Sequence, residues 1–489
     1  MIDQQRKVDR TIPPPLVVDL DGTLVRGDTL IEGLLLLIRT RPAAIVELPF
    51  WLRFGKAGFK RRVADRVVLD PATLPYDERL LEKIREEARQ RHVVLCSAAD
   101  ARIVEAVANH LQCFDSVLAT SGARNLSGQT KADALVSQYG EKGFDYAANS
   151  AVDVPVFRRA RRAWLINPTA ALLRKKRSLE NVELTFPNES GGIRDVWRAL
   201  RPIQWIKNLL VFVPLLATIQ INHLDLLLTA MIAFIAFSLV ASCIYLLNDL
   251  LDLQDDRLHP RKRRRPLASG ALAPTTGLLL AVLTLTTGLG TAIATSRPFA
   301  GMLIVYFVSA MLYSLWLKRV PLMDTIVLAS LYTLRILAGA AAISVVPSVW
   351  LLAFSMFFFL SLALAKRHSE MVELDGISMY SAIPGREYRR EDLQILIAQG
   401  TASGYSAVLV LALYIDSDAV RRQYNHPEII WLVCPLLLYW INKLWLNSQR
   451  REIEDEPLIW AMTNRVSRTV AVISAALLMA ARWVPKHWS

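Results

Sequence analysis

The sequence has little cysteine and no apolar run near its start. Its 489 residues include four cysteines, too scattered for a zinc site or a disulfide framework: Cys96, Cys113, Cys243 and Cys434. We therefore expect reduced thiols in the interior of the protein. Residues 1–15 contain Asp3, Asp9 and three prolines but no apolar segment. They predict a disordered lead without a signal peptide, followed by a domain that stays in the cytoplasm.

The sequence also lacks the patterns of nucleic-acid-binding proteins. The net charge is +13, but no stretch has the pattern of a helix-turn-helix, a zinc finger or an RNA-binding sheet. Long apolar runs are nearly absent before residue 208 and frequent after it. A membrane protein whose cytoplasmic loops are rich in lysine and arginine would carry the same charge. We therefore predict a soluble domain followed by a polytopic membrane bundle, and no nucleic-acid partner.

The second part of the chain repeats apolar runs of roughly 20 residues, the length that spans a bilayer. Most lysines and arginines of this second part lie in the loops at 248–271, 317–320, 366–392 and 447–467, which places these loops on the cytoplasmic side. About nine transmembrane helices are predicted, at about 203–221, 225–247, 272–294, 298–316, 321–343, 347–365, 393–414, 428–446 and 468–484.

The stretch from Asn248 to Gly270 joins a group of carboxylates to a basic cluster. In a helix, Asn248, Asp252 and Asp256 share one face at the spacing i, i+4, i+8. A row of like charges is unfavourable unless a cation neutralises it, and Mg²⁺ bridges carboxylates to phosphate oxygens. The pattern favours a metal–phosphate site, and the alternative is a solvated loop that sets the topology. The acidic residues are Asp249, Asp252, Asp255 and Asp256; the basic ones are Arg257, Arg261, Lys262, Arg263, Arg264 and Arg265.

This stretch resembles the first aspartate-rich motif of the UbiA-type intramembrane prenyltransferase superfamily. The motif reads Asn248-Asp249-x-x-Asp252-x-x-x-Asp256 and continues through Pro266 to Gly270. Upstream, the segment from Arg201 to Asn208 is similar to the branch that makes decaprenyl-phosphate phosphoribose from phosphoribosyl diphosphate. The likeness covers about residues 195–485. It implies a catalytic Mg²⁺ held by Asp249, Asp252 and Asp256, and phosphate binding by Lys207, Asn208, Asn248, Arg257, Lys262 and Arg264.

Further polar residues lie at or near the predicted cytoplasmic ends of the spans. Tyr313 and Lys318 end the fourth span. Arg335 lies inside the fifth, where a charge is expensive and suggests function; a structural ion pair with an Asp of a neighbouring helix is the alternative. After the sixth span, Lys366 and Arg367 stand where many members carry a second aspartate-rich motif, and they resemble the phosphoribosyl branch. They are predicted to hold phosphate, or alternatively to anchor a helix end.

The soluble part begins with a short apolar strand that leads into Asp19-Leu20-Asp21-Gly22-Thr23. Two carboxylates at this spacing allow one to attack phosphorus and the other to protonate the leaving oxygen. The pattern resembles motif one of the haloacid-dehalogenase (HAD) phosphatases. The resemblance implies Asp19 as nucleophile and Asp21 as acid/base. It further implies phosphate binding by Ser97 and Lys131, and Mg²⁺ ligation by Asp19, Asp21, Asn149 and Asp153.

One position departs from the HAD pattern. The family usually has Asp where Asn149 stands, and a carboxamide can ligate Mg²⁺ but brings no charge. This departure puts full phosphatase activity in question. The predicted organisation is a lead (1–15), a Rossmann-like α/β HAD domain (16–168) with a small helical cap at about 27–85, a linker (169–194) and an all-α membrane transferase domain (195–489).

The sequence is compatible with three functions. The first is a bifunctional Mg²⁺-dependent enzyme of a bacterial inner membrane, which transfers phosphoribose from phosphoribosyl diphosphate to a polyprenyl phosphate and then removes the 5-phosphate. The second is transfer of a prenyl chain from a prenyl diphosphate to an aromatic or other acceptor. The third makes the HAD domain a weak or regulatory module. A homo-oligomer is left open.

Overall fold

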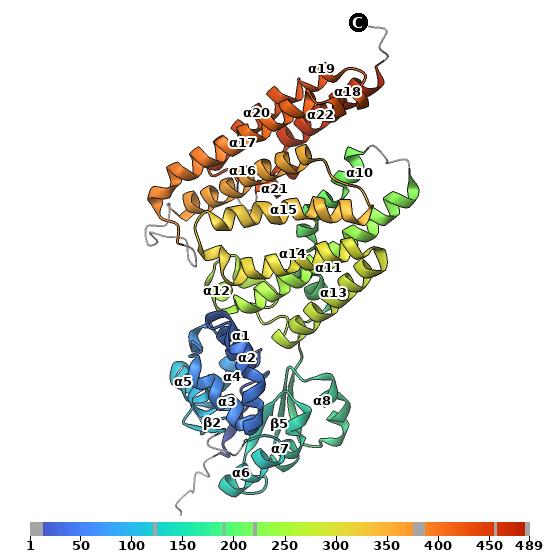
Figure 1. Ribbon diagram of the computed structural model, residues 1–489. Helices are drawn as coiled ribbons and strands as arrows, with labels where there is room; N and C mark the ends of the chain where they lie inside the picture. The colour runs from blue at the N-terminus through green and yellow to red at the C-terminus, as the bar shows by residue number, and fades with distance from the viewer. Residues whose placement is uncertain are drawn as a thin grey trace, which may run out of the picture. The chain divides into compact units, whose positions relative to one another are not determined.

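A six-stranded parallel sheet forms the first part of the chain (Figure 1). The computed structural model describes residues 13–120, 125–188, 191–218, 223–374, 387–453 and 457–484, so most of the predicted lead lies outside the described residues. The sheet has the order β3-β2-β1-β4-β5-β6. Its strands are β1 (Leu16–Val18), β2 (Val93–Asp100), β3 (Ser116–Thr120), β4 (Asp145–Ala148), β5 (Ala163–Ile166) and β6 (Val182–Phe186).

The central strand β1 is apolar at every position because both faces of the sheet are buried. Leu16 and Val18 enter one hydrophobic cluster, whereas Val17 enters the other. Continuous apolar strands of this kind are typical of parallel sheets covered by helices on both sides. The predicted α/β fold is thus confirmed. The helices of this layer are α4 (Glu78–Glu87), α5 (Ala101–Leu111), α6 (Gln129–Tyr139), α7 (Val154–Arg159) and α8 (Ala170–Lys175).

Three helices inserted after β1 form the helical cap: α1 (Thr29–Thr40), α2 (Ala44–Trp51) and α3 (Gly55–Arg66). They enclose a small core of their own, built on Leu37, Ala44, Trp51 and Val63. The apolar residues of α4, in contrast, pack in the cluster of the sheet. The cap therefore ends before α4, earlier than the sequence pattern indicated.

The segment predicted as a linker is largely part of the sheet. Residues 170–175 form α8, and β6 pairs with β5 in parallel. The linker prediction was therefore wrong for residues 170–186. A six-residue helix and a five-residue edge strand are too short to give a clear hydrophobic period, which is read over windows of roughly 11–18 residues.

Within the described residues, eight helices are long and apolar enough to cross a membrane, where about nine were predicted. The first predicted span instead forms the short helices η5 (Pro202–Phe212) and α10 (Val213–Ala217). Prolines at the start of both helices interrupt a longer α-helix. The spanning helices are α11 (Leu224–Leu251), α13 (Pro274–Thr295), α14 (Arg297–Leu315), α15 (Met323–Ala342), α16 (Val349–Leu374), α17 (Leu393–Ile415), α20 (Val433–Gln449) and α22 (Arg465–Trp483).

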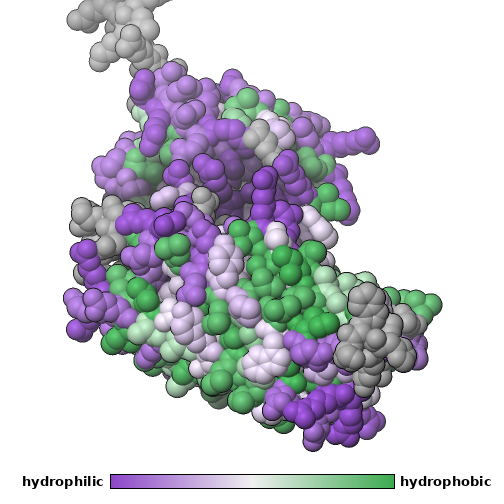
Figure 2. Space-filling model, turned by 90° about the horizontal axis from the view of Figure 1, so that it is seen from above, coloured by the Kyte–Doolittle hydropathy of each residue, from purple (hydrophilic) through white to green (hydrophobic). Residues whose placement is uncertain are grey.

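The spanning helices leave many large apolar side chains exposed. On α13, for example, Leu279 is 67% and Val282 is 53% exposed. Figure 2 shows such apolar residues gathered into continuous areas of the surface. Apolar area of this extent fits contact with lipid. The chain divides into two compact units: Met1–Leu200 with Tyr245–Ala281, and Arg201–Ile244 with Val282–Ser489.

Candidate functional site

The predicted HAD residues meet at the carboxyl ends of the central strands. Asp19 follows β1, Ser97 lies in β2, and Asn149 follows β4. Gly22 has φ +72°, and a Cβ at this position would lie 2.1 Å from the Asn149 amide nitrogen. The turn after β1 therefore requires a glycine so that its backbone can pass next to Asn149. Parallel strands thus deliver residues distant in sequence to one edge of the sheet.

Lys131 joins two carboxylates at this edge. Its Nζ lies 2.7 Å from Asp19 Oδ1 and 3.4 Å from Asp153 Oδ1. It also donates to the Tyr146 hydroxyl, which donates to Asp153. Burial opposes the charge on Lys131, but Asp19 and the other nearby acidic groups raise its pKa well above the ordinary value. The lysine therefore keeps its positive charge in the interior, and this charge can also bind the oxygens of a phosphoryl group.

Asp21 has the protonation behaviour of an acid/base group. Burial, together with the nearby Asp28 carboxylate, raises the pKa of Asp21 to about 7. Its carboxylate accepts a 2.8 Å hydrogen bond from the backbone N–H of Thr29, the first residue of α1. A carboxyl group with a pKa near neutrality can both give and take a proton.

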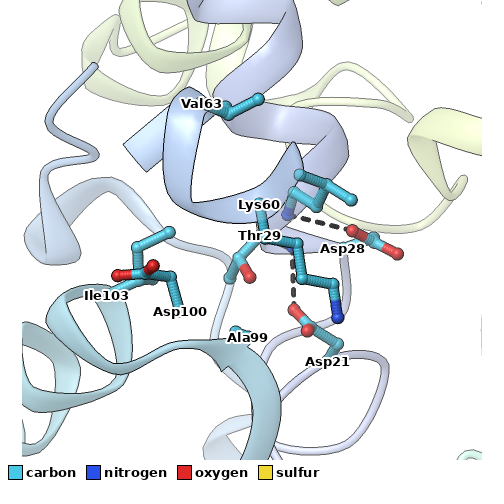
Figure 3. Close-up of a pocket in the computed structure, with 9 residues that line it drawn as sticks. Asp21, Asp28, Thr29, Lys60, Val63, Ala99, Asp100 and Ile103 are labelled. Atoms are coloured by element: carbon cyan, nitrogen blue, oxygen red, sulfur yellow. Dashed lines mark hydrogen bonds between the residues drawn. The ribbon is translucent and has the colours of Figure 1, made fainter. Parts of the chain in front are cut away.

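A cavity lies between the cap and the sheet edge (Figure 3). Asp21 lines it from the sheet side, and Lys60 of α3 lines it from the cap. The Lys60 ammonium donates to the carbonyl of Ala98 and to the side chain of Asn125. Among the basic residues predicted on the cap, Lys60 therefore lines the cavity, whereas Arg62 stacks over Phe54.

The aspartate-rich stretch continues helically past the end of α11. Asp252 donates its backbone N–H to Asn248, and Asp256 donates to Asp252, both at 2.9 Å. Residues Leu253–Leu258 then form α12. The i, i+4, i+8 spacing inferred from the sequence is thus present in the backbone. The side-chain oxygen of Asn248 is buried and has no hydrogen-bond partner among the residues that the structure describes, which leaves an oxygen available to a ligand.

The carboxylates of this stretch are already divided between two arginines. Arg265 Nη1 lies 3.1 Å from Asp249 and 2.5 Å from Asp256. Arg39 of α1 pairs with Asp255 and lies 3.5 Å from Asp252. Burial raises the pKa of Asp256, and Arg265 opposes this shift. Arg265 therefore occupies the place of a cation between two carboxylates, a role that the motif did not indicate.

The three basic residues predicted to bind phosphate in this stretch have different surroundings. Arg257 forms a bidentate ion pair with Glu32, so its guanidinium is already bound by another side chain of the protein. Lys262 and Arg264 are exposed on a short helix, η6 (Lys262–Arg264). Of these three residues, Lys262 and Arg264 therefore present their charges at the surface.

Arg335 lies buried in the second unit among neutral groups. Its guanidinium donates to the Asn208 side chain at 3.1 Å, to the Tyr306 hydroxyl at 2.9 Å and to the carbonyl of Leu331. Within the described residues it has no carboxylate partner, so the alternative of a structural ion pair is not realised. Lys207, next to Asn208, is also buried. Among the described residues Arg335 is thus a buried guanidinium hydrogen-bonded to neutral groups, a setting that an anion would stabilise.

Arg367 is buried in a different environment, where its charge is already neutralised. It pairs with Asp324 and Glu370, and it donates to the Tyr313 hydroxyl at 3.0 Å. Tyr388 also donates to Asp324. Arg367 and Tyr313 therefore belong to a structural network. The neighbouring Lys366 is only half-buried, as is Lys318 on η7 (Leu317–Arg319).

No metal cluster is preassembled among the described residues: none of their groups of three or more Asp, Glu, His or Cys could hold an ion. In both predicted metal sites a cation of the chain lies between two carboxylates, Lys131 in one and Arg265 in the other. Carboxylate and carboxamide oxygens are nevertheless the ligands that Mg²⁺ prefers. The donor set therefore fits the ion at both places.

Comparison with known proteins identifies relatives of most of the chain. Residues 209–462 match the UbiA prenyltransferase family. The protein y4nM of Sinorhizobium fredii is 35% identical over 473 residues, which cover 95% of this chain and 91% of that protein. The nodulation protein NoeC of Azorhizobium caulinodans is 34% identical over 283 residues, which cover 57% of this chain and 90% of NoeC.

A third relative is the decaprenyl-phosphate phosphoribosyltransferase of Mycobacterium tuberculosis. It is 33% identical over 183 residues, which cover 37% of this chain and 61% of that protein. Among solved structures, a UbiA homolog from Archaeoglobus fulgidus bound to GPP and Mg²⁺ has a TM-score of 0.43 at 16% identity. That match covers 58% of this chain and 99% of the homolog.

Proposed function

The chain belongs to the UbiA prenyltransferase family, and from this premise we propose that it transfers phosphoribose from phosphoribosyl diphosphate to a polyprenyl phosphate. The similarity to decaprenyl-phosphate phosphoribosyltransferase supports this choice of substrates. The observation that carries the proposal is the buried Arg335, whose hydrogen bonds within the described part of the chain go to neutral oxygens. A buried cation of this kind is stabilised by an anionic ligand, such as the phosphate of the acceptor lipid.

In the proposed transfer, an oxygen of the lipid phosphate attacks C1 of the ribose while the bond from C1 to the diphosphate breaks. The nucleophile is already an anion, so no strong general base is needed. Arg335 and Lys207 bind and orient phosphate groups. Mg²⁺ bound by Asp249, Asp252 and Asp256 would neutralise charge on the leaving diphosphate.

We further propose that the α/β domain hydrolyses the 5-phosphate of the lipid-linked product. Asp19 attacks phosphorus, and Asp21 protonates the departing 5-oxygen, for which its pKa of about 7 is suited. Water then attacks the acyl-phosphate, Asp21 takes the proton, and inorganic phosphate leaves. Lys131 and Ser97 hold the phosphoryl oxygens. Lys131, already 2.7 Å from Asp19, supports this assignment.

The test is direct. Purified protein is incubated with Mg²⁺, phosphoribosyl diphosphate and a polyprenyl phosphate, and the lipids are analysed by mass spectrometry. We expect a ribosylated lipid phosphate from the wild type, no product from Asp252→Ala, and the 5-phosphorylated lipid from Asp19→Asn, because an amide cannot form the acyl-phosphate. A wild type that instead moves a prenyl chain from a prenyl diphosphate to an aromatic acceptor would overturn the proposal. Complete dephosphorylation by Asp19→Asn would remove the phosphatase role.

A further inference from the structure

Helix α1 contacts both functional parts of its compact unit. At its start, the backbone N–H of Thr29 donates to Asp21. One turn later, Glu32 pairs with Arg257, and near its end Arg39 pairs with Asp252 and Asp255. A 12-residue helix of the cap thus holds side chains of the aspartate-rich stretch, which lies more than 200 positions further along the chain.

The Glu32–Arg257 pair has the geometry of a fixed structural link. Both carboxylate oxygens accept from the guanidinium, at 2.7 and 2.8 Å, and the side chains are 2% and 8% exposed. Arg257 also donates to the carbonyls of Thr73 and Ala268. Arg257 thereby links residue 268 of the stretch to Glu32 of the cap and to Thr73. Two-pronged arginine–carboxylate pairs combine strength with a defined orientation.

The end of the stretch is also in close contact with the α/β domain. Gly270 has φ +73°, and a Cβ there would lie 3.0 Å from the Arg26 Cβ and 3.2 Å from the Pro75 Cβ. The backbone therefore approaches the domain more closely than a side chain would allow. From Asp252 to Gly270, contacts with residues 26–75 recur along the stretch.

We propose that Glu32, Arg39 and Arg257 are positioning residues for the transferase. They fix the segment that carries Asp252 and Asp256, so that the α/β domain contributes to transfer independently of its own hydrolytic chemistry. Arg257 then acts through its protein partners, whereas the motif had suggested phosphate binding. The effect on transfer rests on the proposed function, but the effect on the segment does not.

Amide hydrogen exchange of the full-length protein tests the link without any substrate. In Glu32→Gln and Arg257→Gln we expect exchange of residues 253–270 to rise about tenfold or more, as expected for loss of a buried charge pair. Arg39→Gln, which removes a partly exposed pair, should raise it about two- to fivefold. Either substitution alone already removes the Glu32–Arg257 pair. The exchange rate of residues 253–270 in the Glu32→Gln/Arg257→Gln double variant should therefore be similar to that in each single variant.

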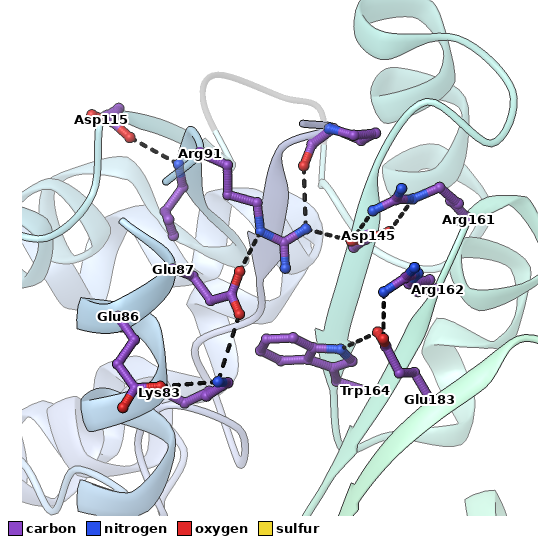
Figure 4. Close-up of polar contacts among 12 residues, drawn as sticks. Lys83, Glu86, Glu87, Arg91, Asp115, Asp145, Arg161, Arg162, Trp164 and Glu183 are labelled. Atoms are coloured by element: carbon purple, nitrogen blue, oxygen red, sulfur yellow. Dashed lines mark hydrogen bonds and ion pairs between the residues drawn. The ribbon is translucent and has the colours of Figure 1, made fainter. Parts of the chain in front are cut away.

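A matched control comes from the Arg91–Asp145 pair, which lies at the amino end of strand β4 (Figure 4). Its side chains are 7% and 1% exposed, comparable to Glu32 and Arg257. Asp145→Asn should leave exchange of residues 253–270 unchanged. Equal effects of Asp145→Asn and Glu32→Gln would mean general destabilisation and would overturn the proposal, as would unchanged exchange in all variants.

A second measurement, the rate of transfer, separates a positioning role in catalysis from a purely structural role. In the transfer assay, Glu32→Gln and Arg39→Gln should lower kcat/KM for phosphoribosyl diphosphate by the same factors, while Asp145→Asn leaves it unchanged. Faster exchange with wild-type transfer would refute the positioning role. If the wild type transfers no phosphoribose, the proposed function fails, and the exchange data still decide whether α1 fixes the segment.

Discussion

A buried arginine takes its role from its partners, and three arginines of this chain illustrate the range. Arg257 is held by Glu32, Arg367 is neutralised by Asp324 and Glu370, and Arg335 has only neutral partners within the described residues. The sequence suggested phosphate binding for all three. Only the surroundings of Arg335 leave its positive charge without a compensating carboxylate, so only Arg335 retains that assignment in our proposal.

The neighbouring residues Lys366 and Arg367 should therefore respond differently to substitution. Arg367→Ala leaves Asp324 buried without its cation, which should destabilise the protein by about 3–5 kcal/mol. Lys366→Ala should keep the stability of the wild type and raise the KM for phosphoribosyl diphosphate or for the lipid phosphate by roughly one to two orders of magnitude. Thermal unfolding in detergent and steady-state kinetics measure the two effects. Equal stability losses in both variants would contradict this division.

The sequence grouped several residues whose side chains lie together in the structure, while their roles stay predictions. Lys131 lies within ion-pair distance of Asp19 and Asp153, and Ser97 belongs to β2, which pairs with β1 in parallel. It could not predict that Arg265 bridges Asp249 and Asp256, or that Glu32 meets Arg257. These pairs depend on how distant segments pack, and no local pattern records such contacts.

At the scale of elements, the apolar runs predicted the spanning helices to within a few residues at most ends, because length and composition suffice for membrane helices. The exceptions were short elements. Helix α8 and strand β6 were predicted as linker, because elements this short contain too few residues to show a hydrophobic period. Strand β6 nevertheless alternates between half-buried and exposed residues, with Leu184 in contact with the core cluster of the sheet and Thr185 exposed.

Strand β6 offers a stringent comparison of two adjacent positions. Leu184→Asp places a charge on the inner face and should lower the stability of the α/β domain by about 2–3 kcal/mol. Thr185→Asp, on the outer face, should change it by less than about 0.5 kcal/mol. Hydrogen exchange of β5 and thermal unfolding report the difference. If residues 182–186 were a linker, both variants would behave as the wild type.

At the scale of the whole molecule, the membrane topology follows from the loop charges and the spanning helices. The basic loop that contains Arg263 and the nearly uncharged loop that contains Val346 are expected on opposite sides of the membrane. Both side chains are exposed, and Val346 is 91% exposed. The prediction places Arg263 and the α/β domain in the cytoplasm.

Cysteine labelling tests this topology. In a Cys113→Ser background, whose remaining cysteines are buried, a reagent that does not cross membranes should label Val346→Cys in intact cells. Arg263→Cys should react only after the membrane is permeabilised. Labelling of both positions from the same side would refute the assigned topology.

The division of this chain by sequence differs from its division in space, because residues 245–281 belong to the same compact unit as residues 1–200. A protein shortened to begin near residue 195 would look like a natural transferase domain. It would nevertheless lose Glu32 opposite Arg257, Arg39 opposite Asp252, and the surface that meets Gly270. Low activity of such a fragment would therefore be uninformative about the chemistry of its membrane helices. Chimeras that exchange the amino-terminal domain need to carry both sides of this contact together.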